Sequence, residues 1–216
     1  MDKDATTIAI PKGRLFTDCV DLFEAIGVAF PPDSEISRKL VFPSKDGSVR
    51  FMVVRDKDVP AYVDHGAADM GIAGKDVLVE AGKDLLEPLD LKFGHCRIVV
   101  AGPDRKKGEN PTGWGHTRIA TNFPRITTAH FASKGEQVEI IPLYGSIELA
   151  PLVGLAERIV DLVSSGETLR QNNLTEIEQV MDVTAKLVVN RASLRTRTER
   201  IVPLIEAMGA VVGAKP

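Results

Sequence analysis

Arg158-Ile-Val-Asp-Leu-Val-Ser-Ser-Gly-Glu-Thr-Leu169 changes character at its midpoint. Residues 159–163 are apolar except for Asp161, which predicts a buried strand, whereas residues 164–168 are polar and predict a loop. Leu169 then begins a helical turn. Strand, loop and helix in this order form the repeating unit of α/β proteins with largely parallel sheets.

The polar loop, residues 164–168, has the composition of an anion site. Its hydroxyl groups donate hydrogen bonds, Gly166 lets the backbone approach a ligand closely, and the N–H groups at the start of a helix attract negative charge. These properties predict a phosphate site. The same residues also suit an ordinary helix cap, so the loop by itself leaves both interpretations open.

Asp161 lies on the predicted strand that leads into this loop. A buried carboxylate is costly unless a donor, a metal or a sugar hydroxyl pairs with it. A sugar beside a phosphate suggests a phosphoribosyl ligand. Upstream, Gly145-Ser146 can cap a short helix, with Glu148 in its first turn.

Three neighbouring segments together are similar to the phosphoribosyl-diphosphate (PRPP) site of the ATP phosphoribosyltransferase family, the first enzyme of histidine biosynthesis. They are Gly145-Ser-Ile-Glu-Leu-Ala-Pro151, Gly154-Leu-Ala156 and Asp161-Leu-Val-Ser-Ser-Gly-Glu-Thr-Leu169. The resemblance implies that ribose hydroxyls contact Asp161 and Glu148. It also implies that the PRPP site, mainly its 5′-phosphate subsite, includes Ser164, Ser165, Gly166, Glu167 through its backbone, Thr168 and Leu169.

Two residues of this loop depart from the family pattern. Many relatives have Ser-Thr-Gly-Ala-Thr-Leu in this loop, whereas Ser165 and Glu167 stand here in place of Thr and Ala. Ser165 keeps the hydroxyl group. Since a carboxylate beside a phosphate is repelled, we expect the Glu167 side chain to point outward or to contact another group.

Composition sets limits on the function. The chain has 216 residues, enough for one large or two small domains. Its 44% hydrophobic content, 26% charged content and net charge of −3 are typical of a globular protein without the basic excess of nucleic-acid binders. No apolar signal region or run of about 18 apolar residues is present, so we expect a cytoplasmic protein outside the membrane.

The cysteine and histidine content predicts no structural metal or disulfide. Cys19 and Cys96 are isolated and are expected to be reduced core residues. The four histidines have no paired metal-ligand spacing, which argues against a zinc site.

The amino-terminal segment places cations at the end of a strand. Residues 6–10 read as a buried strand, and apolar residues recur at helical spacing from Leu15 to Ile26. Pro11-Lys-Gly-Arg14 lies between them, at the carboxyl end of a strand, where open α/β sheets usually bind ligands. A solvated basic turn is the alternative.

Two further strand–helix units follow. Residues 49–54 form a strand followed by Arg55, and Asp56 can cap a helix from Lys57 to His65. Residues 69–73 form another strand, and Gly74-Lys75-Asp76 opens a helix that runs through Glu80. Arg55 suits either a ligand contact or a surface ion pair.

The resemblance extends to these segments and implies a nucleotide site. It implies that Arg55 contacts the triphosphate of ATP or the departing diphosphate, that Arg38 contributes with a looser match, and that Asp69 is structural or touches adenosine. The ATP-site residues that it implies are Lys12, Gly13, Arg14, Arg38, Arg55, Asp69 and Gly74.

The remaining sequence continues the alternation. The Asp46-Gly47 pair predicts a hairpin, and residues 102–115 resemble a crossover or a mobile loop. Other strands are expected at residues 97–101, 118–121, 138–142, 176–183 and 185–190, and helices at residues 125–133 and 199–208. We expect Arg195, Arg197 and Arg200 to form a solvated face or a subunit contact rather than a phosphate site.

The predicted fold is therefore α/β, with two lobes that have mixed, largely parallel sheets. The resemblance adds that the arrangement is periplasmic-binding-protein-like. We expect a first lobe at residues 1–94 with 188–216, on the nucleotide side, and a second lobe at residues 95–187 that holds the PRPP loop. Ligand is expected in the cleft between them.

The implied reaction is attack by N1 of the adenine of ATP on C1 of PRPP, with inversion and loss of diphosphate. Since N1 has a lone pair, no protein nucleophile is needed, and catalysis reduces to alignment and charge stabilisation. Lys12, Arg14 and Arg55 are the candidate catalytic residues. Mg²⁺ is expected to be held by substrate oxygens, without dedicated protein ligands.

The resemblance also implies partners. The chain ends at Pro216 without a regulatory domain for histidine, which is typical of the short form of the family. Short forms work with a regulatory subunit that resembles histidyl-tRNA synthetase, so we expect a homodimer inside a hetero-oligomer. The alternatives are a non-catalytic bilobed solute-binding protein and a structural subunit whose partner is the active chain.

Overall fold

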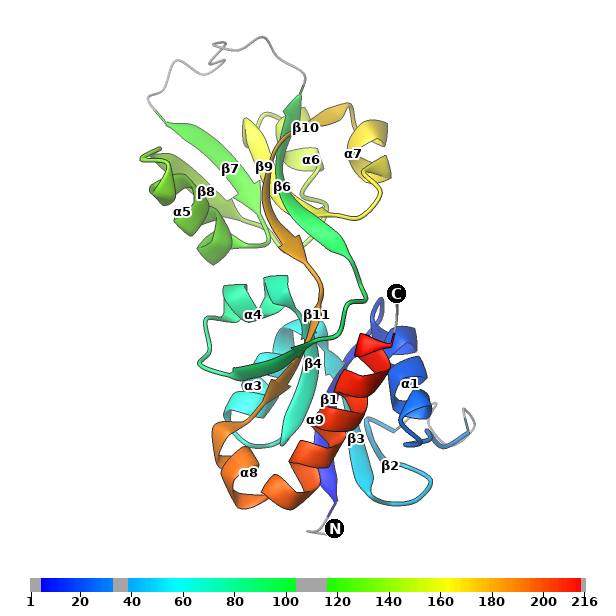
Figure 1. Ribbon diagram of the computed structural model, residues 1–216. Helices are drawn as coiled ribbons and strands as arrows, with labels where there is room; N and C mark the ends of the chain where they lie inside the picture. The colour runs from blue at the N-terminus through cyan, green and yellow to red at the C-terminus, as the bar shows by residue number, and fades with distance from the viewer. Residues whose placement is uncertain (1–4, 33–38, 104–115, 215–216) are drawn as a thin grey trace. The chain divides into compact units, whose positions relative to one another are not determined.

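The computed structural model describes residues 5–32, 39–103 and 116–214, which belong to two compact units. Unit 1 comprises Met1–Gly94 with Thr184–Pro216, and unit 2 comprises His95–Val183 (Figure 1). The return to the first unit thus begins at residue 184, whereas we expected it at residue 188. The reason is that the whole strand Ala185–Val189 pairs with the sheet of unit 1.

Unit 1 is built on one mixed sheet. Its strands are β1 (Thr6–Lys12), β2 (Val41–Pro43), β3 (Val49–Arg55), β4 (Met70–Gly74), β5 (Leu86–Asp90) and β11 (Ala185–Val189). They lie in the order β2-β3-β1-β4-β11-β5. Strand β1 pairs in parallel with β3 and β4, whereas β2 and β11 run antiparallel to their neighbours. The carboxyl ends of β1, β3 and β4 therefore meet at one edge.

Helices cover both faces of this sheet. They are α1 (Phe16–Ala25), the 3-10 turn η1 (Asp56–Asp58), α3 (Val59–Asp64), α4 (Lys75–Ala81), α8 (Arg191–Thr196) and α9 (Thr198–Gly213). Ile8 and Ile10 pack with α1 and α9, whereas the intervening Ala9 packs with α3 and α4, as the alternation of side chains along a strand requires. Alanine and glycine on the second face let α3 approach closely: a Cβ at Gly71 would lie 2.8 Å from Val59 Cγ1.

Unit 2 contains the second mixed sheet. Its strands are β6 (Cys96–Pro103), β7 (Thr117–Thr121), β8 (Val138–Pro142), β9 (Arg158–Val163) and β10 (Leu174–Val183), in the order β10-β6-β9-β7-β8. Its helices are α5 (Pro124–Ser133), α6 (Leu149–Leu152) and α7 (Glu167–Gln171). Strands β9, β7 and β8 are parallel, and β6 runs antiparallel to both of its neighbours. The segments after β8 and β9 hence leave the same edge of the sheet.

Two predicted caps are wrong. Asp56 does not cap a helix: it lies in η1, its Oδ1 accepts a hydrogen bond from the adjacent Lys57 N–H, and the α-helix begins at Val59. Ser146 does not cap α6 either, because its backbone has a φ of +48° and the helix starts at Leu149. Asp56 and Ser146 lie near the predicted starts of their helices, but in each case the backbone makes an extra turn before the helix begins.

Two elements were not predicted at all, strand β5 and helix α8. The expected loop over residues 102–115 lies mostly outside the described residues, as does Arg38. Within the described part of the chain, no helix has both the length and the apolar character needed to cross a membrane.

Candidate functional site

The carboxyl edge of the unit 1 sheet gathers most of the residues that were expected to bind the nucleotide. Lys12 and Arg55 are direct neighbours in the parallel register of β1 and β3. Gly74 ends β4 at the same edge, since Ala9 is level with Gly71 and both strands continue for three residues. Gly13 has a φ of +101°, and the backbone turns there from β1 towards α1.

The cations of this edge differ in their contacts. Lys12 and Arg55 are exposed, and neither side chain forms a hydrogen bond or an ion pair with any residue in the described ranges. The surface ion pair that was the alternative for Arg55 thus has no described partner. Arg14 is exposed as well, but its Nη1 donates a hydrogen bond to the Gly94 carbonyl oxygen at 2.9 Å.

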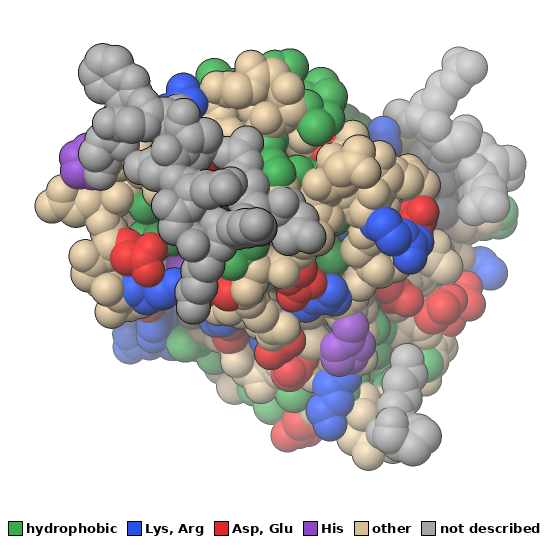
Figure 2. All heavy atoms as spheres, turned by 90° about the horizontal axis from the view of Figure 1, so that it is seen from above, with side chains coloured by type: hydrophobic (Ala, Val, Ile, Leu, Met, Phe, Trp, Pro, Cys, Tyr) green, Lys and Arg blue, Asp and Glu red, His purple; other side chains and the backbone are tan. Residues whose placement is uncertain are grey.

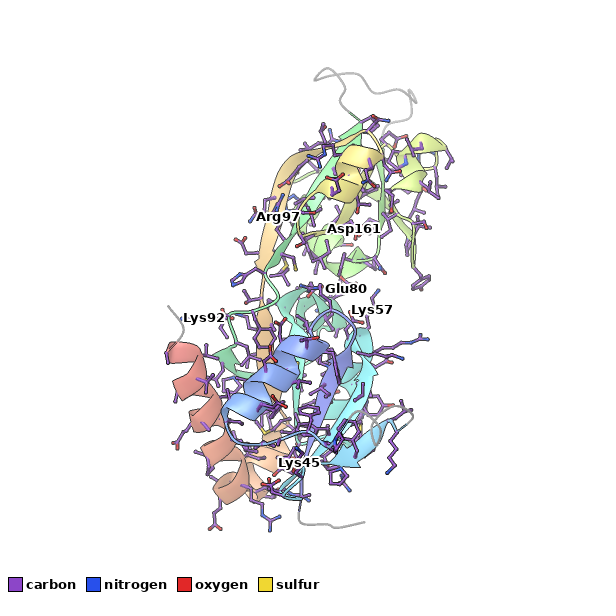
Figure 3. The ribbon with its side chains drawn as sticks, turned by 90° about the vertical axis from the view of Figure 1, so that its right-hand side faces the viewer. Lys45, Lys57, Glu80, Lys92, Arg97 and Asp161 are labelled. Atoms are coloured by element: carbon purple, nitrogen blue, oxygen red, sulfur yellow. The ribbon has the colours of Figure 1, made fainter. Side chains whose placement is uncertain are left out.

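Asp69 does not belong to this group, because it precedes β4 and lies at the opposite edge of the sheet. Only 6% of the residue is exposed. Its Oδ2 accepts hydrogen bonds from the Thr7 N–H at 2.8 Å and from Arg197 Nη1 at 3.0 Å, and its Oδ1 accepts one from Ser193 Oγ at 2.7 Å. Of the two roles expected for Asp69, structural or in contact with adenosine, these contacts favour the structural one. Figure 3 shows the two ends of the sheet through Lys45, which precedes β3, and Lys57, which follows it.

The same network explains one of the carboxyl-terminal arginines. Arg197 was expected on a solvated face or in a subunit contact, but it forms an ion pair with Asp69. A buried carboxylate needs such donors, and the segment from Asn190 to Arg197 supplies two of them.

Asp76 also lies at the carboxyl edge, although the sequence analysis assigned it only to the start of a helix. It lies in the first turn of α4, only 5% exposed, and its Oδ1 has no hydrogen-bond partner among the described residues. Burial raises the pKa of the Asp76 carboxyl, and Asp56 adds to this rise. The Val77 N–H and the charge of Arg14 oppose it. In the sequence, the signal that could have identified Asp76 was an acidic residue just after the end of a predicted strand.

The polar loop of unit 2 follows β9 as expected. Gly166 precedes α7 with a φ of +78°, a conformation that glycine adopts readily. Ser164, Ser165 and Thr168 are exposed, and Ser165 Oγ accepts a hydrogen bond from the Glu167 N–H at 3.4 Å. Three hydroxyl groups are thereby available at the carboxyl end of a parallel strand.

Glu167 and Leu169 are positioned by α7 itself. The Glu167 carboxylate pairs with Arg170 and accepts a hydrogen bond from Gln171 Nε2 at 2.9 Å, so it contacts its own helix. Leu169 is 7% exposed and packs in the core with Val163. Its side chain therefore anchors the loop to the core of unit 2.

Asp161 and Glu148 lie near the same edge of unit 2. Asp161 is half-buried rather than buried, and its Oδ1 accepts a hydrogen bond from the Leu162 N–H at 2.8 Å. Since side chains alternate, Asp161 lies on the face of β9 that packs against α6 and α7. Glu148 is half-buried and immediately precedes α6, in the segment after β8. The structure thus brings both carboxylates to the edge that carries the loop.

Arg97 is a further residue beside the loop that sequence reasoning missed. It comes from β6, the neighbour of the β9 strand that carries Asp161 (Figure 3). Its Nη1 donates to the Ser164 carbonyl oxygen at 3.3 Å, and its Nη2 donates to Glu176 Oε2 at 2.7 Å. The Glu176 carboxylate raises the pKa of Arg97. A lone arginine on a strand gives no signal of this kind in the sequence.

On the face that Figure 2 shows, Lys and Arg side chains alternate with Asp and Glu side chains. In the described ranges, no three His, Cys, Asp or Glu side chains are arranged to hold a metal ion.

Comparison with known proteins gives consistent results. The family model for HisG, ATP phosphoribosyltransferase, matches residues 55–210. The ATP phosphoribosyltransferase of Syntrophotalea carbinolica is 55% identical over 210 residues, which cover 97% of this chain and 96% of the relative. That of Citrifermentans bemidjiense is 56% identical over 206 residues, which cover 95% of this chain and 97% of the relative.

Solved structures show the same likeness. A chain of the ATP phosphoribosyl transferase (HisG:HisZ) complex from Thermotoga maritima superposes with a TM-score of 0.83 at 37% identity, covering 96% of this chain and 98% of that one. A putative L-cystine ABC transporter from Listeria monocytogenes superposes with a TM-score of 0.56 at 12% identity, covering 96% of this chain and 90% of that one. The second likeness concerns the fold alone.

Proposed function

Because the chain belongs to the ATP phosphoribosyltransferase family, we propose that its two strand edges divide the substrates of that enzyme between them. The enzyme transfers the 5-phosphoribosyl group of PRPP to N1 of the adenine of ATP and releases diphosphate, in the first step of histidine biosynthesis. The observation that carries this function is the similarity to the named relatives along nearly the whole chain. A solute-binding role has only a shared fold in its favour.

The nucleotide is assigned to unit 1. Lys12 and Arg55 are exposed cations without described partners, side by side at the carboxyl edge of the sheet. The triphosphate of ATP and the departing diphosphate are highly anionic, so uncompensated cations at a strand edge suit them. Arg14 joins them with its side chain held at Gly94. In this proposal, the three cations stabilise the negative charge that develops on the leaving group.

PRPP is assigned to unit 2. Ser164, Ser165 and Thr168 present exposed hydroxyl groups beside the backbone of Gly166, which suits the 5′-phosphate. Asp161 and Glu148 offer carboxylate oxygens to ribose hydroxyls, which are hydrogen-bond donors. Because Glu167 is paired within α7, its charge is partly compensated where the phosphate would bind.

The chemistry needs alignment more than a reactive side chain. N1 of adenine attacks C1 of the ribose, the bond from C1 to the diphosphate oxygen breaks, and the electron pair leaves with the diphosphate. The protein holds the two substrates in line and compensates charge. We propose that Mg²⁺ enters with the phosphate oxygens of the substrates, because hard divalent cations prefer such ligands and the described residues form no cluster for a metal.

The assembly follows from the Thermotoga maritima relative, which is part of a HisG:HisZ complex. We propose that this chain likewise assembles with a HisZ-type regulatory subunit, as a homodimer within a hetero-oligomer. A cytoplasmic location is part of the same proposal, since its relatives are enzymes that act on ATP.

The test is product detection by mass spectrometry. The purified chain is incubated with ATP, PRPP and Mg²⁺, alone and with a HisZ-type subunit, and the phosphoribosyl-ATP adduct and released diphosphate are measured. We expect both products in at least one of the two mixtures. Neither product in either mixture, despite measurable PRPP binding, would contradict the assignment. Omission of PRPP is the matched control for both mixtures.

A further inference from the structure

Asp76 combines burial with an unsatisfied oxygen at the edge assigned to ATP. It is 5% exposed, and Oδ1 has no hydrogen-bond partner among the described residues. An unpaired buried carboxylate oxygen costs free energy, and such groups in native proteins usually have a functional reason. The Val77 N–H in the first turn of α4 donates a hydrogen bond to the carboxylate, and Oδ1 still has no partner among the described residues.

Gly74 makes room for this carboxylate. A Cβ at position 74 would lie 2.2 Å from Asp76 Oδ1 and 3.3 Å from its Cγ. Side-chain atoms do not approach so closely, so any larger residue at position 74 would displace the carboxylate. The Oδ1 atom is therefore over the last residue of β4, at the edge where β1 and β3 also end.

The surroundings of Asp76 restrict the ligand group that could satisfy it. Its electrostatic neighbours are Arg14, which is attractive, and Asp56, which is repulsive. A phosphate oxygen carries negative charge and no donor at neutral pH, so it would be repelled by the carboxylate. The 6-amino group of adenine and the ribose hydroxyls are uncharged donors, and ATP presents both.

We propose that Asp76 determines nucleotide specificity, with Oδ1 accepting a hydrogen bond from an uncharged donor on the nucleoside part of ATP. The donor is either the 6-amino group of adenine or a ribose hydroxyl. This inference rests on the proposed function, since it requires ATP at the carboxyl edge of unit 1. A site that hydrogen-bonds a substrate donor rejects analogues without it, because a buried polar group is then left unpaired.

The test is a cycle of protein and substrate changes. Wild type, Asp76→Ala and Asp76→Asn are compared with ATP and with three analogues, purine riboside triphosphate, 2′-deoxy-ATP and 3′-deoxy-ATP. Purine riboside lacks the amino group but keeps the N1 lone pair, so it still allows the attack. Dissociation constants come from calorimetry and kcat/KM from steady-state assays. The matched control is Asp58→Ala, which changes an exposed carboxylate in η1.

We expect Asp76→Ala to weaken ATP binding by about 10-fold or more, the usual effect of losing a hydrogen bond to a charged group. We expect Asp76→Asn, which keeps an acceptor and the side-chain volume, to have a smaller effect. For the one analogue that lacks the relevant donor, wild type and Asp76→Ala bind alike, which identifies the donor. The KM for PRPP stays unchanged.

Equal losses with ATP and all three analogues would overturn the proposal, as would an equal rise in the KM for PRPP. The proposed function fails separately, when wild type forms no adduct from ATP and PRPP. In that case the calorimetric comparison still decides whether Asp76 contacts the nucleoside.

Discussion

Asp69 and Asp76 flank the same strand, and the difference between them separates structure from function in unit 1. Both residues are almost equally buried, 6% and 5% exposed. Asp69, before β4, accepts hydrogen bonds from Thr7, Ser193 and Arg197. Asp76, after β4, has an oxygen without a described partner. Burial is thus no guide to role, whereas the presence or absence of internal donors is.

The same contrast extends along the two edges of the sheet. At the amino edge, the Asp69 network joins the start of β1 to the carboxyl-terminal segment. At the carboxyl edge, Lys12 and Arg55 have no described partners. A protein that leaves both signs of charge uncompensated at one edge loses stability there, which is a common property of binding sites.

The largest effect is expected from Asp69→Ala. The change leaves Arg197 and the Thr7 N–H without their acceptor, so the free energy of unfolding should fall by about 2–4 kcal/mol. Urea denaturation followed by circular dichroism measures it. A loss below about 0.5 kcal/mol, the size expected of a surface change such as Asp58→Ala, would erase the contrast between the two carboxylates.

Arg55→Ala should act on catalysis instead of stability. The exposed guanidinium has no described partner, so unfolding is unaffected, while kcat/KM for ATP falls about 100-fold through lost charge stabilisation. Steady-state assays and thermal denaturation distinguish the two effects. The control is Arg195→Ala, which changes an exposed arginine in α8. A large drop in the melting temperature of Arg55→Ala would indicate a structural role.

Gly74→Ala sharpens the comparison through geometry alone. The new Cβ would collide with Asp76 Oδ1, so the carboxylate must move, and ATP binding should weaken about 10-fold. Calorimetric titration with ATP gives the change. Because Gly74 belongs to unit 1 and the PRPP loop belongs to unit 2, PRPP affinity should be unaltered. Unchanged ATP affinity would show that the position of the Asp76 carboxylate is unimportant.

The smallest effect concerns the pH dependence of stability. Burial raises the pKa of Asp76 in the folded state, so the folded protein binds this proton more tightly than the unfolded chain does. The ionised carboxylate therefore destabilises the fold above its folded pKa, and this penalty disappears as the pH falls below the unfolded value. Asp76→Asn should be as stable as wild type or more stable at neutral pH, and the gap should narrow on acidification. Urea midpoints across pH 4–8 would reveal a gap that widens instead, contrary to this expectation.

Regular elements were readily predicted from the sequence where apolar periodicity was clear. Strand β8 has the predicted bounds, and α5 begins at Pro124, one residue before the predicted start, and ends at the predicted residue. Strand β5 was missed because Leu-Glu-Pro-Leu-Asp contains a proline and alternates weakly. Helix α8 was missed because it has no buried residue to produce a periodic pattern. Its start is capped by the Asn190 side chain, which accepts a hydrogen bond from the Ser193 N–H.

The candidate site shows the same division between local and long-range information. Strand ends are local, so Lys12, Arg55 and the loop after β9 were predicted at their edges. Asp69 was grouped with the ATP-site residues of the carboxyl edge. Because it precedes strand β4, its order along the chain already assigns it to the amino edge. The partners of Asp69 and Arg97 could not be predicted, because they come from segments 62 or more residues away in sequence.

The central claim is that the carboxyl edge of unit 1 binds ATP while the amino edge supports the fold. Calorimetric titration of ATP into wild type, Asp76→Ala and Ser193→Ala tests it directly, since Ser193→Ala removes only one hydrogen bond to Asp69. We expect weaker ATP binding for Asp76→Ala and wild-type affinity for Ser193→Ala. Equal weakening in both variants, or none in Asp76→Ala, would contradict it.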